Sequence, residues 1–326
     1  MVLVLNAVLP VFLLAALGYF LFRIGFITRD ISVGLNQLVY WVGLPSLLFH
    51  KISRQQLEWS SVSDVLSAFF LALAGTVLLA YVISWFLRID AKSLGAFVQA
   101  AYRGNLGFIG LPIVLYSFSQ GDIERSEAIA AISLAPCAIA FNIIAVALMI
   151  AHQPKTPAKR PRFLFFFLTN PLIVGGVLGV TAASLELDLP LFVDRSFEGL
   201  SNMSVPVALL GLGASLGFFG IKEFKRDLVV AIFGTTLLKI LVSPLLGVVM
   251  SVFLVLDFVE ARIVVIYLAT PTAIASNVIV GQFGGDEKLA ASSIVSATLG
   301  SILFLPLALW ITGEQTWGKL LQLAGH

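Results

Sequence analysis

The chain has 326 residues and a net charge of +2, with 59% hydrophobic and 12% charged residues. Soluble globular domains carry about 25% charged residues, so this chain has too few charges to cover a globule in water. Its mean hydropathy of +1.01 agrees with that conclusion. The composition excludes a soluble protein and predicts an all-α polytopic membrane protein. We expect the protein to lie in the lipid bilayer, and we expect no nucleic acid among its partners.

Ten apolar segments are long enough to cross a bilayer, since a membrane helix needs about 20 apolar residues. Eight of them contain no Asp, Glu, Lys or Arg, whereas Arg103 lies in the fourth and Lys239 in the eighth. The first segment lacks the basic start and cleavage site of a signal peptide, so we expect it to be retained. In chain order the segments are 2–22, 31–50, 65–87, 93–121, 128–152, 163–185, 199–221, 228–256, 263–285 and 289–313.

The Lys and Arg residues between these segments predict the orientation of the chain. The loops after odd-numbered segments hold 12 of them, and the loops after even-numbered segments together with the tail hold 6. Short loops rich in Lys and Arg stay on the cytoplasmic side. We therefore expect a multi-pass protein with both termini extracytoplasmic and a cytoplasmic linker at 153–162.

The two halves of the chain share landmarks at a constant offset. Three pairs of like residues are each 161 positions apart, namely Pro10 with Pro171, Gly18 with Gly179 and Pro45 with Pro206. Because each half has five segments, the second half would be inverted relative to the first, as in many secondary transporters. We predict a first repeat at 1–152 and an inverted second repeat at 163–326. Chance matching of Pro and Gly is the alternative.

The fourth and ninth segments contain helix-breaking residues near the middle of the bilayer. Gly107, Gly110 and Pro112 interrupt the fourth segment after Gly104, and Pro271 interrupts the ninth. Glycine raises backbone freedom and proline removes a hydrogen-bond donor. Lipid cannot satisfy the freed backbone groups, so paired breaks in two halves indicate a transporter's binding site. Two structurally neutral proline kinks are the alternative.

Eight residues near the breaks are the candidate substrate-binding residues. Half-helix N-termini offer free N–H groups to an anion, and two asparagine amides would add to them. Charged residues inside a membrane are functional candidates, although they also snorkel or bind carbonyls, and asparagines also join helices. The candidates are Arg103, Gly104, Asn105, Lys239, Thr270, Pro271, Thr272 and Asn277.

These motifs resemble the auxin efflux carrier family, which includes plant auxin exporters and bacterial malonate-type carriers. The similar segments are 104–112, 169–173, 205–210, 271–277 and 284–286, and the similarity covers essentially the whole chain. Plant members have proline at the position of Gly104 and a long central loop that is absent here. These departures favour a bacterial organic-anion carrier of the cell inner membrane over an auxin carrier.

The resemblance implies a fold and a mechanism. It implies ten helices in a bile-acid-symporter or sodium–proton-antiporter-like fold, with helices 1, 2, 6 and 7 as a scaffold domain. Helices 3–5 and 8–10 would form a transport domain in which broken helices 4 and 9 cross, at Gly104-Asn105 and at Pro271-Thr272. It further implies an elevator-type alternating-access cycle and a homodimer through the scaffold domain.

We expect neither an enzyme nor a cofactor or metal. Residues 213–217 read Gly-Ala-Ser-Leu-Gly, but a nucleophile elbow of this pattern needs a strand–turn–helix and a His/Asp pair. Close helix packing by small residues explains the pattern better. No segment carries Asp, Glu or a central His, which a proton relay usually needs. Coupling to Na⁺ held by backbone carbonyls, or to H⁺, stays open.

Together these observations predict a secondary active transporter of small organic anions such as malonate- or auxin-like carboxylates. The charges inside the segments are cationic, so a cationic substrate would lack a partner of opposite charge. Two alternatives stay open. One is a sodium-coupled symporter of the bile-acid type, and the other is a channel or receptor on the same fold.

The orientation can be tested by cysteine labelling in a Cys137→Ala background, since Cys137 is the single cysteine. Cysteines placed at either terminus should react with a membrane-impermeant reagent in intact cells, and cysteines in the 153–162 linker should not. Labelling of the linker would contradict the orientation inferred from the Lys and Arg distribution.

Overall fold

The computed structural model describes residues 2–54, 59–118, 121–152, 170–217 and 226–325. Within these ranges the regular structure is helical, apart from one isolated backbone bridge. Seven helical stretches are long and apolar enough to span a membrane: Asn6–Arg23, Arg29–Ile52, Trp59–Phe86, Ile123–His152, Leu191–Leu216, Arg226–Phe253 and Glu287–Ile311. The chain is therefore a polytopic helical membrane protein, as its composition predicts.

The other three predicted segments contain shorter helices. The fourth segment is divided into α5 (Ala91–Tyr102), the π-helical turn η2 (Leu106–Gly110) and α6 (Leu111–Tyr116). The ninth is divided into α13 (Phe258–Ala269) and α14 (Ala275–Gln282). Only α9 (Pro171–Ser184) represents the sixth segment, because 163–169 and the predicted linker at 153–162 lie outside the described residues.

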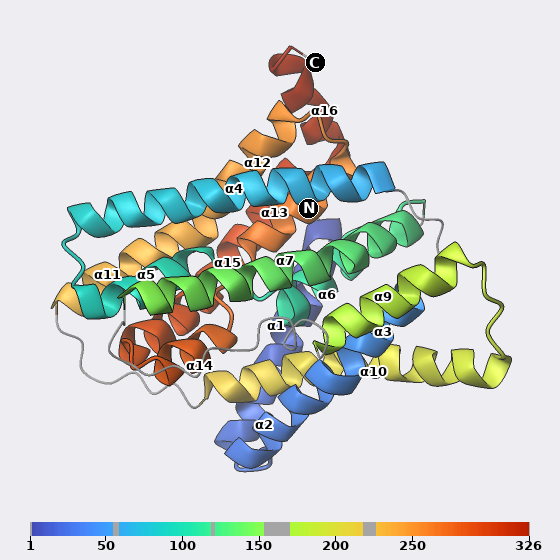
Figure 1. Cartoon of the computed structure of the whole chain (residues 1–326), viewed down its shortest axis with the longest axis horizontal. Helices are drawn as coiled ribbons and strands as arrows, with labels where there is room; N and C mark the ends of the chain where they lie inside the picture. The colour runs from blue at the N-terminus through green and yellow to red at the C-terminus, as the bar shows by residue number, and fades with distance from the viewer. Residues whose placement is uncertain (1, 55–58, 119–120, 153–169, 218–225, 326) are drawn as a thin grey trace.

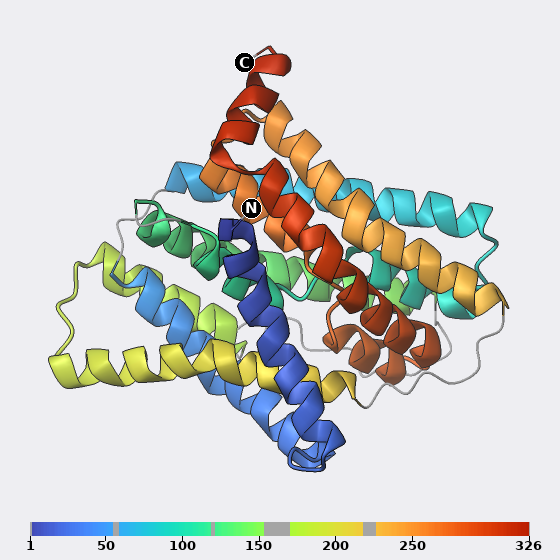
Figure 2. The same ribbon diagram turned by 180° about the vertical axis from the view of Figure 1, so that it is seen from behind.

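One group of helices includes α1 and α10, which cross each other in close contact (Figure 2). Small residues permit this approach, because a Cβ on Gly213 would overlap the backbone oxygen of Ala15, and one on Gly18 would overlap that of Leu210. A similar contact joins α9 to α3 at Gly175 and Pro45. The group consists of α1 (Val2–Arg23), α2 (Arg29–Leu38), α3 (Leu44–Ile52), α9 and α10 (Leu191–Leu216).

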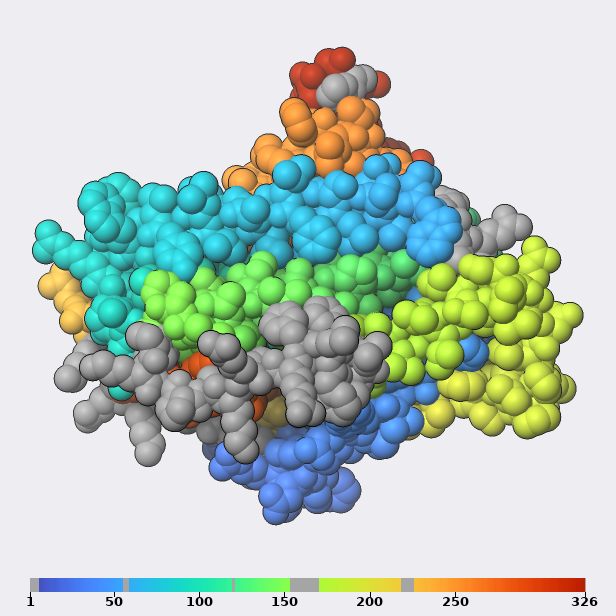
Figure 3. All heavy atoms as spheres, viewed as in Figure 1, coloured from blue at the N-terminus to red at the C-terminus, as the bar shows by residue number. Residues whose placement is uncertain are grey.

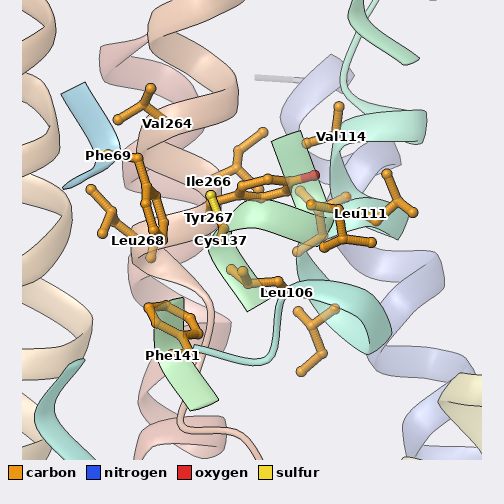
Figure 4. Close-up of a cluster of buried hydrophobic side chains, with 14 of the residues drawn as sticks. Phe69, Leu106, Leu111, Val114, Cys137, Phe141, Val264, Ile266, Tyr267 and Leu268 are labelled. Atoms are coloured by element: carbon orange, nitrogen blue, oxygen red, sulfur yellow. The ribbon is translucent and has the colours of Figure 1, made fainter. Parts of the chain in front are cut away.

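The second group surrounds the interrupted segments (Figure 1). Its long helices α4 and α7 lie side by side on one face of the molecule (Figure 3). Figure 4 shows its apolar core, in which Phe69 of α4 and Phe141 of α7 lie near Tyr267 and Leu268 of the ninth segment. The group consists of α4 (Trp59–Phe86), α5, α6, α7 (Ile123–His152), α11 (Arg226–Leu237), α12 (Ser243–Phe253), α13, α14, α15 (Glu287–Ile311) and α16 (Glu314–Leu323).

In the described part of the chain, three helical segments contain a π turn, and each turn is followed by a proline. The turns are η1 (Val39–Gly43), η2 and η3 (Leu238–Val242), and Pro45, Pro112 and Pro244 follow them. Proline has no N–H to donate and its ring crowds the preceding turn, so the helix widens locally. Such π turns are frequent at functional sites, and all three lie near the interrupted segments.

The close packing of α10 predicts opposite effects for two glycine substitutions in that helix. Gly213→Ala should lower the free energy of unfolding by about 1–3 kcal/mol, because the new methyl group overpacks against the α1 backbone. Gly199→Ala is the matched control, since nothing lies within 4 Å of its added Cβ, and it should leave stability unchanged or raise it. Thermal unfolding of the two purified variants measures this, and equal melting temperatures would contradict the described packing.

Candidate functional site

The two interrupted segments meet each other through their backbones. Gly104 and Thr272 form an isolated antiparallel bridge. On either side of it, the Asn105 N–H donates to the Pro271 oxygen at 2.9 Å and the Ala273 N–H donates to the Arg103 oxygen at 3.0 Å. We call residues 103–105 and 271–273 the crossing. It joins the two breaks that the sequence indicates, although their substrate-binding role stays a prediction.

Side chains of the crossing and of the adjacent Thr270 cap the neighbouring helix ends. The Thr272 hydroxyl donates to the Ala100 oxygen of α5 at 2.8 Å, and the Thr270 hydroxyl donates to the Tyr267 oxygen of α13 at 2.7 Å. The Asn105 side chain accepts a hydrogen bond from the Phe108 N–H at 3.3 Å, so it caps the turn that begins the second half of its segment. These bonds satisfy backbone groups that lipid would leave unpaired.

A cavity of about 710 Å³ lies between the crossing and the first helix group. Asn105 and Asn277, two of the candidate substrate-binding residues, line it, and no Asp or Glu is among the described residues of its wall. The wall consists of Arg29, Val33, Asn36, Gln37, Tyr40, Asn105, Phe108, Ser215, Ala273, Ile274, Ala275, Asn277 and Val278.

The cavity offers amide groups with unused hydrogen-bonding capacity. The Asn36 amide nitrogen donates to the Ser215 hydroxyl at 2.9 Å. The side-chain oxygens of Asn36 and Asn277 are buried and have no partner among the described residues. Because an amide presents donors at one end and an acceptor at the other, rotation by 180° exchanges them. Both residues line the cavity, but their unpartnered oxygens are buried and do not open onto it.

The two cations predicted to bind substrate do not line this cavity. Arg103 is 6% exposed, and its Nη2 donates to the Asn142 side-chain oxygen at 2.6 Å. Its Nη1 has no hydrogen-bond partner within the described ranges. Lys239 is fully buried, and its Nζ donates to the Tyr102 oxygen at 3.2 Å and the Leu268 oxygen at 2.9 Å. Substrate binding by Arg103 and Lys239 stays a prediction. The contacts of Lys239 correspond to the alternative, in which a lysine inside the membrane binds backbone carbonyls.

The remaining predicted residues serve the crossing or its packing. Gly104, Thr270, Pro271 and Thr272 belong to the crossing and its caps and are absent from the cavity wall. Gly107 and Gly110 lie in η2, where an added Cβ would come within 3.0 Å of the side chains of Leu44 and Thr270. Pro112 is the second residue of α6. The glycines therefore permit close packing, and the proline begins a helix.

Sequence reasoning missed the wall that the first helix group contributes. Asn36, Gln37 and Tyr40 come from α2 and η1, and Ser215 comes from α10. The available signal was the polar pair Asn36-Gln37 inside an otherwise apolar segment. Ser215 lies in the Gly-Ala-Ser-Leu-Gly stretch, which we interpret as helix packing. Its hydroxyl contacts the Ser32 hydroxyl at 3.1 Å, in agreement with that interpretation.

A second cavity, of about 770 Å³, lies near the α3 end and the α9–α10 connection. An ion pair of Arg54 with Asp194 lies in its wall, together with the acidic residues Glu186 and Asp188. It is distant in the chain from both breaks. Elsewhere in the described residues, no group of three or more His, Cys, Asp or Glu side chains could hold a metal ion.

The Thr272 hydroxyl gives a direct test of the crossing. Thr272→Val should lower the free energy of unfolding by about 1–3 kcal/mol, because the buried Ala100 oxygen loses its donor. Thr181→Val removes a hydroxyl that bonds a carbonyl four residues earlier in the same helix, at an exposed position. It should change stability by less than about 0.5 kcal/mol. Comparison of the two melting temperatures checks the difference, and equal losses would argue against the crossing contact.

Comparison with known proteins adds independent findings. A family model described as membrane transport protein matches residues 3–311. An uncharacterized transporter of Methanocaldococcus jannaschii is 24% identical, covering 94% of this chain and 98% of its own. An uncharacterized transporter of Methanothermobacter thermautotrophicus is 26% identical, covering 93% of this chain and 96% of its own. A proposed malonate transporter of Rhizobium meliloti is 25% identical, covering 90% of this chain and 91% of its own.

Proposed function

We propose that this chain, which belongs to the membrane transport protein family, is a secondary active transporter of small organic anions such as malonate-type carboxylates. The family match confirms the resemblance to auxin efflux carriers, and the relatives are named as transporters and not as enzymes. The observation that carries the proposal is the cavity beside the crossing, with Asn105 and Asn277 in its wall.

The charge distribution around the cavity favours an anion. Its described wall contains Arg29 and no carboxylate. The first residues of α14 also line it, and the N–H groups at a helix start carry partial positive charge. Arg103 adds a buried guanidinium at the crossing itself. An anion would meet opposite charge here, whereas an amine would meet none among the described wall residues.

The arrangement of the helices supports an elevator-type cycle. We propose ten spans in two inverted repeats, with α1–α3, α9 and α10 as the scaffold domain and the second helix group as the transport domain. The cavity wall comes from both groups, so a movement of one group against the other would carry a bound substrate across the membrane. The bacterial inner membrane, extracytoplasmic termini and a homodimer through the scaffold rest on the family resemblance and the Lys and Arg distribution.

Two other functions remain as competing outcomes. A sodium-coupled symporter of the bile-acid type shares crossed broken helices, and would need Na⁺ for uptake. A channel or receptor on this fold would show no counterflow, that is, no acceleration of labelled uptake by unlabelled substrate inside the vesicle. Transport by alternating access produces such counterflow, since each cycle returns the binding site to the other side.

We expect purified protein in proteoliposomes to exchange a small mono- or dicarboxylate saturably. Asn105→Ala and Asn277→Ala should each weaken apparent substrate affinity by about 10-fold, as expected for the loss of one or two hydrogen bonds to a charged ligand. Asn202→Ala is the matched control, since Asn202 is an exposed residue of α10 outside the cavity wall. Counterflow with a carboxylate panel, followed by concentration dependence for each variant, makes the measurement.

Three results would contradict the anion specificity, the roles of the two asparagines and the transport mechanism, respectively. Saturable transport of an organic amine, without a response to any carboxylate, would contradict the anion specificity. Normal affinity and rate in both cavity variants would contradict the assignment of Asn105 and Asn277. Flux that does not saturate and shows no counterflow would favour the channel.

A further inference from the structure

Lys239 connects the C-terminal ends of both interrupted helices. Its Nζ donates to the Tyr102 oxygen, on the last residue of α5, at 3.2 Å. It also donates to the Leu268 oxygen, one residue before the end of α13, at 2.9 Å. These two carbonyls are 166 positions apart in the chain, yet one ammonium group binds both. The side chain is fully buried, so water does not compete for these bonds.

The Lys239 ammonium is opposed by the ends of two helices and not by an acidic side chain. Within the described residues, no Asp or Glu forms an ion pair with Lys239. The C-terminal end of a helix carries roughly half a negative charge, so two such ends supply about one. A single ammonium therefore neutralises both ends. This explains how a buried cation, which is costly inside a membrane, is accommodated here.

The backbone at the crossing leaves room for the ammonium. A Cβ added to Gly104 would lie 3.1 Å from the Lys239 Nζ, and it would also overlap the Thr270 hydroxyl. Any side chain at position 104 would therefore press on both groups. The π turn η3 contributes as well, because Lys239 is the second of its five residues and the wider turn sets where the side chain leaves the helix.

In secondary transporters with broken helices, carbonyls at half-helix C-terminal ends are common ligands for a coupling Na⁺. Here the same type of position is filled by a covalently attached cation. We propose that the Lys239 ammonium is a built-in substitute for a coupling cation at the crossing, so that transport requires no Na⁺. This inference rests on the proposed transport function and specifies its ion dependence.

The two sides of each break have different roles. The C-terminal ends of α5 and α13 bind Lys239, whereas Asn105 and the start of α14 line the cavity. Lys239 is absent from the cavity wall. It therefore acts as a positioning residue that keeps the crossing assembled and does not touch the substrate.

The first test uses the wild-type protein and needs no substrate. Its melting temperature in detergent should be the same in sodium chloride, potassium chloride and N-methylglucamine chloride at equal ionic strength. If a carboxylate is transported, its rate in proteoliposomes should likewise be independent of which of these cations is present. Specific stabilisation or stimulation of the wild type by Na⁺ would overturn the proposal.

Two substitutions of Lys239 separate its charge from its volume. Lys239→Ala opens a space beside the two carbonyls, so Na⁺ should raise its melting temperature by several degrees relative to N-methylglucamine, as any ion that binds only the folded state does. Lys239→Met fills the space without a charge and should gain no such response. Its transport rate should fall by about 10-fold or more, because two buried carbonyls lose their donor.

Ser243→Ala is the matched control, since Ser243 is a fully buried polar residue of the next turn and its hydroxyl has no partner in the described part of the chain. It should behave like the wild type in every salt. An equal sodium response in Lys239→Ala and Lys239→Met, or wild-type rates in Lys239→Met, would overturn the proposal. Because the melting temperatures are measured without substrate, their outcome stands apart from whether organic anions are the cargo.

Discussion

The structure depends on one constraint, which is that a backbone group freed inside a bilayer must find a partner within the protein. The two interrupted segments satisfy this constraint for each other. The Asn105 N–H reaches the Pro271 oxygen and the Ala273 N–H reaches the Arg103 oxygen. Neither interruption would be stable alone in lipid, so each break requires the other. The helices α5, α6, α13 and α14 are thereby held around a common point.

Proline residues extend the effect of that constraint into the helices around the crossing. The π turns before Pro45, Pro112 and Pro244 place Tyr40 and Phe108 in the cavity wall and Lys239 at the crossing. In each case a missing backbone donor is accommodated by a wider turn and not by a complete break. The site therefore combines two true interruptions, the first at Gly104 and the second at Pro271, with three local widenings that each precede a proline.

The sequence predicted the breaks because Gly104, Pro112 and Pro271 have strong local effects on the backbone. The location of Asn105 and Asn277 near the crossing could be predicted, because both residues lie close to those breaks in the sequence. The place of Asn36 and Ser215 in the cavity wall could not be predicted. It depends on how α2 and α10 pack against the crossing, which involves contacts between distant parts of the chain. The orientation of the Lys239 side chain was undetermined for the same reason, since snorkelling and carbonyl binding are both compatible with a lysine in a long apolar segment.

The geometry of the crossing bears on why no carboxylate lies among the described residues of the crossing or of the cavity wall. Half-helices that meet end to end bring negative C-terminal ends and positive N-terminal ends to the same depth. Lys239 occupies the negative ends, and the positive start of α14 remains at the cavity. A carboxylate side chain there would compete with an anionic ligand for this positive helix end, and it would itself require a cation. Omitting acidic residues therefore leaves the positive start of α14 available to a ligand.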